Sequence, residues 1–290
     1  MILIRVLTTI AEMREASTMA RTSGKLGLVP TMGALHEGHL SLVRAARREC
    51  DAVAVSIFVN PTQFAPNEDF ERYPRTLESD LGVLEREGVE LVFAPSAEEM
   101  YSRSGTTVVD PGAIGERLDG KFRPGHFRGV ATVVAKLFHI VSPDAAFFGQ
   151  KDAAQVAVLQ AMVRDLNFPV RMVVCPTVRE ADGLALSSRN RNLSAQERSD
   201  ALALSRTLTA VCAMVVSGVH DAEDVREALD AELRILPGLK VEYAEVVDPA
   251  TLEPLTDVRD GALIAVAAHV GATRLIDNIV LPPLEKESAL

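Results

Sequence analysis

Two histidines, His36 and His39, stand three positions apart in the segment VPTMGALHEGHLSL. The segment follows a short apolar run and leads into a helical pattern. Histidines at positions i and i+3 share one face of a helix, and the N–H groups at a helix N-terminus attract anions. We therefore predict that the pair meets the phosphates of a nucleotide. Gly38 lies between them, and its missing Cβ would let a flat ring lie against the backbone.

Two other interpretations of this histidine pair stay open at this point. The pair could be half of a zinc site, or two exposed histidines with no role. The metalloprotease helix motif has its histidines four positions apart, and a third and fourth zinc ligand are not evident in the sequence. We therefore predict no metal held by the protein, and we look to other loops for support of the phosphate interpretation.

A second polar segment, GQKDAAQ, carries Lys151 and Gln155 at the start of a helical pattern. The two residues are four positions apart, so they share a helix face. A lysine suits a phosphate, and the glutamine amide suits a hydroxyl or carboxylate of a second ligand. An ordinary helix start is the alternative interpretation.

Two further polar segments follow apolar runs. Ser187, Ser188 and Arg189 come after Gly183 and form a loop of the kind that closes over polyphosphate, or else a solvated linker. The segment NPTQF, residues 60–64, puts two amides beside an aromatic ring where a strand ends.

Strands and helices alternate between these loops. Apolar runs at 26–29, 52–59, 89–94, 144–148 and 170–175 predict strands, and residues 38–49, 76–87, 126–141 and 151–166 predict helices. The alternation indicates an α/β fold with a Rossmann-like, doubly wound parallel sheet. Such a sheet binds ligands outside the carboxyl ends of its strands, so the polar loops should converge on one crevice.

The pattern changes after residue 185, which predicts a domain over 1–185 and a smaller one over 186–290. Ser194 and Glu197 form a capping box that opens a helix to about Val216. A helix near 221–235 and strands at 240–248, 262–270 and 273–281 follow, so the second domain should be α+β.

The composition narrows the class of protein. With 48% hydrophobic and 24% charged residues, the 290-residue chain is typical of a globular protein with a full core. A net charge of −10 opposes binding to nucleic acid. Charges interrupt the apolar N-terminal run, and no stretch approaches the roughly 20 apolar residues of a membrane span. We expect a cytoplasmic protein in which Cys50, Cys175 and Cys212 are reduced.

The motifs PTMGALHEGH, SIFVNPTQF, ERYPRT, FFGQKDAAQ and GLALSSRN together resemble the pantothenate synthetase (pantoate–β-alanine ligase) family over almost the whole chain. The HEGH element also resembles the H-x-G-H motif of the wider nucleotidyltransferase superfamily, and LSSRN stands where aminoacyl-tRNA synthetases of that superfamily carry a KMSKS-type loop. The resemblance implies that pantoate and ATP form a pantoyl adenylate and pyrophosphate. The amine of β-alanine then displaces AMP to give pantothenate. It also implies Mg²⁺ accompanying the ATP and a homodimer.

The resemblance also implies roles for individual residues. The expected ATP-binding residues are Met32, Gly33, Ala34, Leu35, His36, Glu37, Gly38, His39, Gly149, Gln150, Lys151, Asp152, Val178, Leu186, Ser187, Ser188 and Arg189. The expected pantoate and β-alanine residues are Gln63, Gln155, Asn60, Tyr73 and Arg123, with Lys121 and Arg128 as alternatives to Arg123. His39, His36, Lys151 and Arg189 are the expected catalytic donors, because in-line attack on phosphorus is accelerated by positioning and by cations. Some family members carry consecutive acidic residues where this chain has Glu78, Ser79 and Asp80, so we do not assign Asp80 as a magnesium ligand.

Three rival functions compete with this one. Another nucleotidyltransferase would join a nucleotide to a phosphate ester, but Gln63 and Gln155 are neutral and do not suit a phosphorylated partner. A tRNA synthetase would need a basic face and an anticodon-binding region, and neither is evident. A nucleotide-binding regulator without catalysis would keep the same crevice, and only an activity measurement separates it from an enzyme.

Overall fold

The computed structural model describes residues 4–65, 70–102 and 104–284. The chain divides into two compact units. Unit 1 comprises residues 1–116, 123–150 and 158–176, and unit 2 comprises 117–122, 151–157 and 177–290. The last division falls between Pro176 and Thr177, whereas the sequence placed a domain boundary between 185 and 186.

Unit 1 contains a six-stranded sheet in the order β1-β4-β3-β2-β5-β6, and every pair in it is parallel. The strands are β1 (Arg5–Leu7), β2 (Leu26–Thr31), β3 (Ala52–Ile57), β4 (Leu91–Phe93), β5 (Ala145–Gly149) and β6 (Arg171–Cys175). From β2 the chain moves outward through β3 to β4, and from β5 it moves outward the other way to β6, so the predicted doubly wound α/β fold is confirmed. Strand β1, the first in the chain, pairs at the edge beyond β4. The point where the direction reverses is where such sheets bind ligands.

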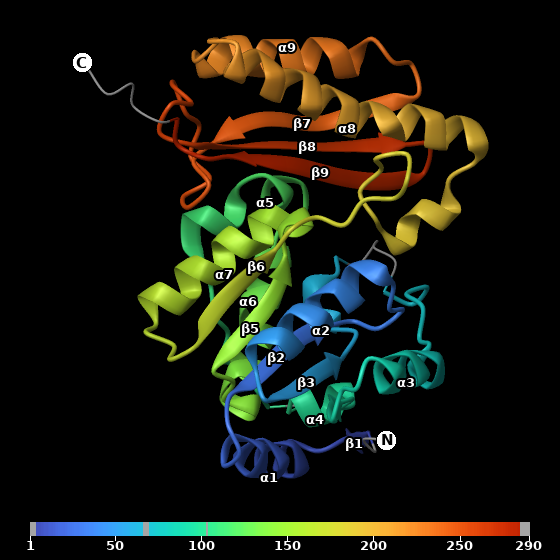
Figure 1. Ribbon diagram of the computed structural model, residues 1–290, viewed down its shortest axis with the longest axis vertical. Coiled ribbons are helices and arrows are strands. Elements are labelled where there is room, and N and C mark those ends of the chain that lie inside the picture. The colour runs from blue at the N-terminus through green and yellow to red at the C-terminus, as the bar shows by residue number, and fades with distance from the viewer. Residues whose placement is uncertain (1–3, 66–69, 103, 285–290) are drawn as a thin grey trace. The chain divides into compact units, whose positions relative to one another are not determined.

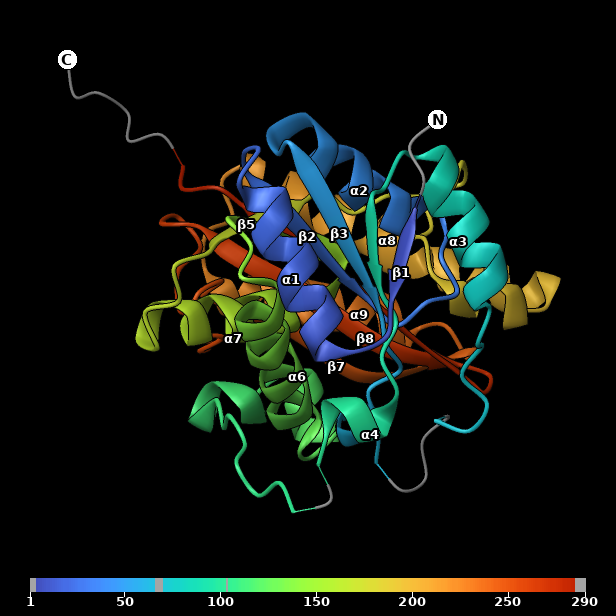
Figure 2. The ribbon, with the colours of Figure 1, turned by 90° about the horizontal axis from the view of Figure 1, so that it is seen from below.

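The helices are α1 (Ile10–Arg21), α2 (Glu37–Glu49), α3 (Leu77–Arg86), α4 (Ala97–Met100), α5 (Asp119–Phe122), α6 (His126–Val141) and α7 (Ala153–Asp165). Short 3-10 turns are η1 (Pro61–Gln63), η2 (Gly112–Glu116), η3 (Gln150–Asp152) and η4 (Ser188–Asn192). Residues of α2 and α3 join one face of the sheet in a buried cluster that includes Val43, Leu84 and Phe147. Helices α1 and α6 pack on each other and on β2, and Figure 2 shows both beside the strands.

The sequence interpretation missed the N-terminal elements β1 and α1. Strand β1 pairs with β4 at the edge of the sheet. Helix α1 begins with a capping box, in which Thr9 Oγ1 accepts from the Glu12 N–H at 3.2 Å and the Glu12 carboxylate accepts from the Thr9 N–H at 3.0 Å.

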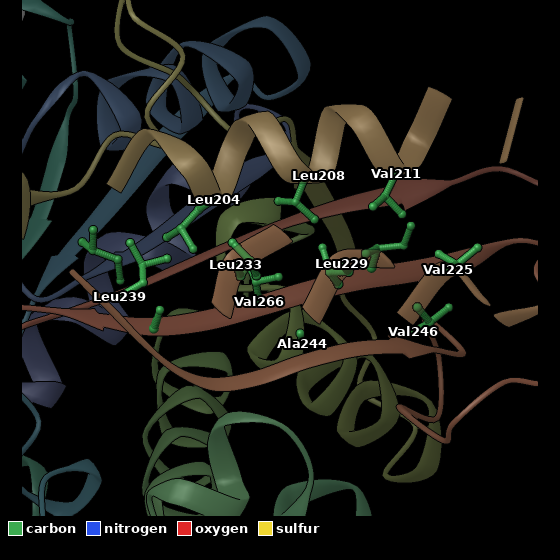
Figure 3. Packing of buried hydrophobic residues seen from close by; sticks show 14 of the residues in the cluster. Leu204, Leu208, Val211, Val225, Leu229, Leu233, Leu239, Ala244, Val246 and Val266 are labelled. Atoms are coloured by element: carbon green, nitrogen blue, oxygen red, sulfur yellow. The ribbon is translucent and has the colours of Figure 1, made fainter. Parts of the chain in front are cut away.

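Unit 2 contains an antiparallel sheet, β7 (Leu239–Val247), β8 (Ala262–Val270) and β9 (Thr273–Leu281), in the order β7-β8-β9. Helices α8 (Ala195–Val216) and α9 (Ala222–Arg234) lie over one face of this sheet, as Figure 1 shows. Leu204 and Leu208 from α8 meet Leu229 from α9 and Val266 from β8 in a buried cluster (Figure 3). The predicted α+β character of the C-terminal part is confirmed.

Helix α8 corrects one statement made from the sequence. It has 22 residues and is long and apolar enough to cross a membrane by length and composition, although no such stretch was expected. A core helix passes the same test, and the α8 side chains Leu204, Leu208 and Val211 are buried in the cluster of unit 2. The three cysteines take part in no disulfide.

Candidate active site

The two histidines of the HEGH motif form the start of helix α2. His36 is the N-cap residue, and its Nδ1 accepts a hydrogen bond from the Gly38 N–H at 3.2 Å. In return, His39 Nδ1 accepts from the His36 N–H at 3.3 Å. Their ring centroids are 4.1 Å apart. The pair therefore works as a reciprocal cap, a role that Ser, Thr or Asp more often fills.

This cap determines which nitrogen of each ring carries its proton. A neutral imidazole has one donor and one acceptor nitrogen, and the hydrogen-bond partners decide which is which. Because both Nδ1 atoms accept from backbone N–H groups, both neutral rings carry the proton on Nε2. His36 and His39 are thus set up as Nε2–H donors at a helix N-terminus, where the helix dipole also favours an anion.

The loop between β2 and α2 is shaped by Asp80, which lies in α3 and is 3% exposed. One carboxylate oxygen accepts from the Leu35 N–H at 2.9 Å, and the other accepts from the Ala34 N–H at 3.0 Å. The Thr76 hydroxyl donates to the second oxygen at 3.1 Å. Ala34 has a φ of 51°, a left-handed conformation that is costly for a residue with a Cβ. The buried carboxylate holds the loop in that conformation.

The turn after β3 is organised by Asn60, which is 1% exposed. Its Nδ2 donates to Gln63 Oε1 at 3.0 Å and to the Gly129 carbonyl at 3.2 Å. Gly129 in α6 is required here, because a Cβ at this position would lie 2.3 Å from the Thr62 carbonyl oxygen. The turn that carries Gln63 is therefore pressed directly against the backbone of α6.

Arg123 and His126 hold the backbone of the same turn. His126 Nδ1 lies 2.9 Å from the Gln63 carbonyl oxygen, and Arg123 Nη1 lies 3.0 Å from His126 Nε2. Arg123 also donates to the Gln63 carbonyl at 3.4 Å. By contrast, Arg128 lies near Asp110, 4.0 Å away, with more than half of its side chain exposed. The structure thus connects Arg123 to Gln63, and it adds His126, which sequence reasoning had not singled out.

Tyr73 lies beside an aromatic residue of the same turn. Its ring meets the Phe64 ring edge-on, with the centroids 6.1 Å apart. Phe64 in turn meets Phe70 at 5.4 Å. These rings close the turn on the side of the ERYPRT segment.

The predicted residues after β5 lie in η3 and the first turn of α7, with Gln150 in unit 1 and Lys151, Asp152 and Gln155 in unit 2. Lys151 Nζ lies 3.7 Å from Asp152 Oδ1, and 22% of the lysine side chain is exposed. The Lys151 carbonyl accepts from Asn278 Nδ2 at 2.9 Å, which ties η3 to β9. Gln155 follows on the first turn of α7 and is half-buried.

The predicted residues Val178 and Leu186 lie opposite each other in a short hairpin of unit 2. The Leu186 N–H donates to the Val178 carbonyl at 2.9 Å, and the backbones of Arg179 and Ala185 form an antiparallel β-bridge. Gly183, with φ +96°, turns the chain at the tip. Arg179 also donates to both carboxylate oxygens of the buried Asp277, at 2.7 and 2.9 Å. The polar segment between β6 and the serine-arginine turn thus contains an anchored hairpin.

The serine-arginine segment follows this hairpin as the turn η4. Ser187 is its N-cap, and its hydroxyl accepts from the Arg189 N–H at 3.2 Å. Asn190 is buried and donates to Glu180 Oε1 at 2.6 Å and to the Ala185 carbonyl at 3.0 Å. The turn is thus bonded to the hairpin of the same unit.

Each unit therefore gathers part of the predicted set. Unit 1 brings together the residues from Met32 to His39, in the loop after β2 and the first turn of α2, and the pair Asn60 and Gln63 at the turn η1. Gln63 Nε2 lies 3.4 Å from Met32 Sδ. Unit 2 carries Lys151, Gln155 and the hairpin residues. In residues 4–65, 70–102 and 104–284, no group of three or more His, Cys, Asp or Glu side chains is arranged to hold a metal ion.

Comparisons with known proteins agree on one family. The sequence profile described as Pantoate-beta-alanine ligase matches residues 5–280. A pantothenate synthetase from Acidobacterium capsulatum is 58% identical, covering 96% of this chain and 97% of the relative.

Solved structures lead to the same family. The crystal structure of pantothenate synthetase from Thermus thermophilus matches with a TM-score of 0.89 and 47% identity, over 97% of this chain and 100% of that one. Pantoate-beta-alanine ligase from Francisella tularensis, solved with Beta-gamma ATP and beta-alanine, matches with a TM-score of 0.77 and 33% identity, over 96% and 98%. The chain therefore belongs to the pantoate–β-alanine ligase family, the enzymes named pantothenate synthetases.

Proposed function

We propose that this enzyme condenses pantoate with β-alanine in two steps through an enzyme-bound pantoyl adenylate. In the first step a pantoate carboxylate oxygen attacks the α-phosphorus of ATP, and pyrophosphate leaves. In the second step the β-alanine amine attacks the acyl carbon, AMP leaves, the amine loses a proton, and pantothenate forms. The observation that carries this proposal is the reciprocal histidine cap at the start of α2.

The cap supports the first step for an electrostatic reason. Charge shifts onto the phosphate oxygens as the α-phosphorus becomes five-coordinate, and preorganised donors stabilise that charge without reorienting. His36 and His39 carry such donors on Nε2, as the hydrogen bonds to their Nδ1 atoms require. We assign His39 to the α-phosphate.

The remaining roles follow the family resemblance. Lys151 and Arg189 are proposed as cationic partners of the phosphates, and Gln155 as a second amide for pantoate. We propose that pantoate binds in a site, called the acid site below, that is formed by Gln63, Asn60, Tyr73 and Arg123. The Francisella tularensis relative was solved with Beta-gamma ATP and β-alanine, which supports ATP and β-alanine as ligands here.

Magnesium is proposed to arrive on the phosphates of ATP. The described residues offer no cluster of ligands for it, and both oxygens of Asp80 already accept backbone N–H groups. We also propose that the enzyme is a cytoplasmic homodimer acting on small molecules, not on nucleic acid or membranes. Light scattering on the purified protein would test the dimer.

Isotope exchange between pyrophosphate and ATP tests the proposed function. An adenylating enzyme should exchange label when pantoate is present and β-alanine is absent, whereas a nucleotide-binding regulator should not. His39→Ala should lower the exchange rate by roughly 10² to 10³, the usual effect of losing one preorganised donor. The exposed His139 in α6 provides a control, because His139→Ala should leave exchange unchanged. Exchange that needs no pantoate, or a normal rate in His39→Ala, would contradict the proposal.

A further inference from the structure

Tyr101 is a half-buried tyrosine at the end of α4 that neither the sequence motifs nor the proposed reaction uses. Its hydroxyl lies 2.8 Å from Asn60 Oδ1, in unit 1. We propose that Tyr101, acting through Asn60, fixes the orientation of the Gln63 amide, so that Gln63 presents its NH₂ group to an acceptor oxygen of pantoate. Tyr101 and Asn60 are then positioning residues. The inference rests on the proposed role of Gln63 in binding pantoate.

The first step concerns the orientation of the Asn60 amide. Its oxygen accepts from the Tyr101 hydroxyl at 2.8 Å, the Thr62 hydroxyl at 2.9 Å and the Thr62 N–H at 3.3 Å. A flipped amide would point its NH₂ group at the Thr62 N–H and its oxygen at the Gly129 carbonyl, which now accepts from Nδ2 at 3.2 Å, and both hydroxyls would have to change from donors to acceptors. The Tyr101 hydroxyl is suited to donating because burial raises its pKa, so it stays protonated. Asn60 therefore has one permitted orientation.

The second step concerns how the orientation of the Asn60 amide determines that of the Gln63 amide. With its oxygen occupied, Asn60 can meet Gln63 only through Nδ2, which donates to Gln63 Oε1 at 3.0 Å. Gln63 must then direct its own NH₂ group elsewhere. That group lies 3.4 Å from Met32 Sδ, and thioether sulfur is a weak acceptor. A carboxylate or hydroxyl oxygen of pantoate would be a far better partner for the same N–H.

The third step concerns rigidity, because a fixed amide needs a fixed backbone. The Gln63 carbonyl is held by His126 and Arg123, and the Gly129 contact sets the distance of the turn from α6. The Tyr101 ring is also held, with Lys136 Nζ 5.7 Å from its centroid. A phenylalanine at position 101 would keep the ring and lose only the hydroxyl.

The consequence for specificity is a preference for acids over their amides. A ligand carboxylate accepts hydrogen bonds only, so it matches an outward NH₂ group. A ligand amide could turn either its oxygen or its nitrogen toward Gln63, so its binding should depend far less on how the Gln63 amide is oriented.

The first test is Tyr101→Phe, measured by pantoate-dependent exchange. The KM for pantoate should rise roughly three- to tenfold, the worth of one neutral hydrogen bond, while kcat and the KM for ATP stay within about twofold. Thr132→Val is the matched control, since it removes a buried hydroxyl of the same unit that bonds to the Val109 N–H and the Arg128 carbonyl. The control should lose comparable stability without a change in KM. An unchanged KM for pantoate in Tyr101→Phe overturns the inference.

The second test, Asn60→Asp, is designed to reverse which end of the Gln63 amide faces the ligand. A carboxylate at position 60 cannot donate, so Gln63 must turn its NH₂ group inward and its oxygen toward the ligand. Binding of pantoate, measured by calorimetry, should weaken by more than about tenfold, while binding of the neutral pantoamide should change less. Equal weakening for both ligands overturns the inference, and if Asn60→Asp does not fold, Tyr101→Phe alone decides.

Gln63→Ala separates this inference from the proposed function. If Gln63→Ala binds pantoate normally, the proposed acid site is wrong. If Gln63→Ala loses pantoate while Tyr101→Phe retains it fully, the acid site stands and only the positioning role of Tyr101 is wrong.

Discussion

The two units use buried aspartates in different ways. In unit 1, Asp80 accepts from two backbone N–H groups and a hydroxyl, all of them neutral. In unit 2, Asp277 and Asp119 are each paired with an arginine, Arg179 and Arg274. A buried carboxylate needs compensation in both cases. Backbone N–H groups compensate the charge of Asp80, and the carboxylate fixes the shape of a loop. Arginines compensate the charges of Asp277 and Asp119, and these ion pairs connect segments that are far apart in the sequence.

The charged network of unit 2 shows the second case in detail. Arg274 donates to Asp119 at 2.7 Å and to Glu242 at 2.8 Å, and the Tyr243 hydroxyl donates to Asp119 at 3.2 Å. Burial, with the Asp119 charge beside it, raises the pKa of Tyr243 well above its ordinary value. Tyr243 therefore donates to Asp119 as a protonated hydroxyl at neutral pH, and the network joins α5 to β7 and β9.

Replacing Asp80 should give the largest effect on catalysis, because it should change the use of ATP. Asp80→Ala removes the acceptors of Ala34 and Leu35, so the loop of unit 1 loses its left-handed turn. We expect the KM for ATP in the exchange reaction to rise roughly 10- to 100-fold, since hydrogen bonds to a charged group are worth about 1.5 to 3 kcal/mol each. Glu78→Ala, an exposed neighbour on α3, is the control and should behave as wild type. A normal KM for ATP in a folded Asp80→Ala enzyme would show that Asp80 does not shape a loop that binds ATP, and the difference between the buried aspartates of the two units would then be wrong.

Replacing Arg274 should act on stability instead. Arg274→Met leaves Asp119 and Glu242 without their cation while keeping much of the side-chain volume. Urea unfolding should show a loss of about 3 kcal/mol, the low end for breaking a buried ion pair, because 21% of the Arg274 side chain is exposed. The KM for ATP of the folded variant should not move. A large KM change with little loss of stability would mean that this network, too, shapes a ligand site.

The smallest effect should come from Glu180, which lies near the tip of the hairpin in unit 2. Hydrogen bonds from Arg198 and then Asn190 lower its pKa below the ordinary 4.5. A carboxyl group whose pKa is lowered by folding adds stability above its unfolded pKa, and this stability is lost as the pH falls through the folded value. Wild type should therefore exceed Glu180→Gln in unfolding free energy at neutral pH, and the gap should shrink below about pH 4.5. A gap that is constant from pH 7 to pH 3 would show that the charge of Glu180 contributes nothing.

The sequence predicted elements well where the pattern is local. Strands β8 and β9 begin and end where the apolar runs do, and α6 covers the predicted range. The capping boxes of α1 and α8 have the same form, but the sequence predicts only the helix of the second, whose box opens a long helical pattern.

Prediction failed where a contact joins distant residues. The motif residues could be singled out, but the role of Asp80 could not, because its partners Ala34 and Leu35 lie 46 and 45 positions away. For the same reason Tyr101 had no visible signal, since its partner Asn60 is 41 positions away. Residue types and short spacings indicate which groups can do chemistry, whereas the side chains that orient them are known only from the fold.

The close approach at Gly129 links the size of one helix residue to the position of a turn on another part of unit 1. Because a single added methyl group there would collide with the Thr62 carbonyl, the turn that carries Gln63 cannot accommodate change at position 129 unless it moves as a whole. A substitution at this position of α6 would therefore displace the Gln63 amide without touching its side chain. Under the proposed function, a helix residue that contacts no substrate would then change how pantoate is bound.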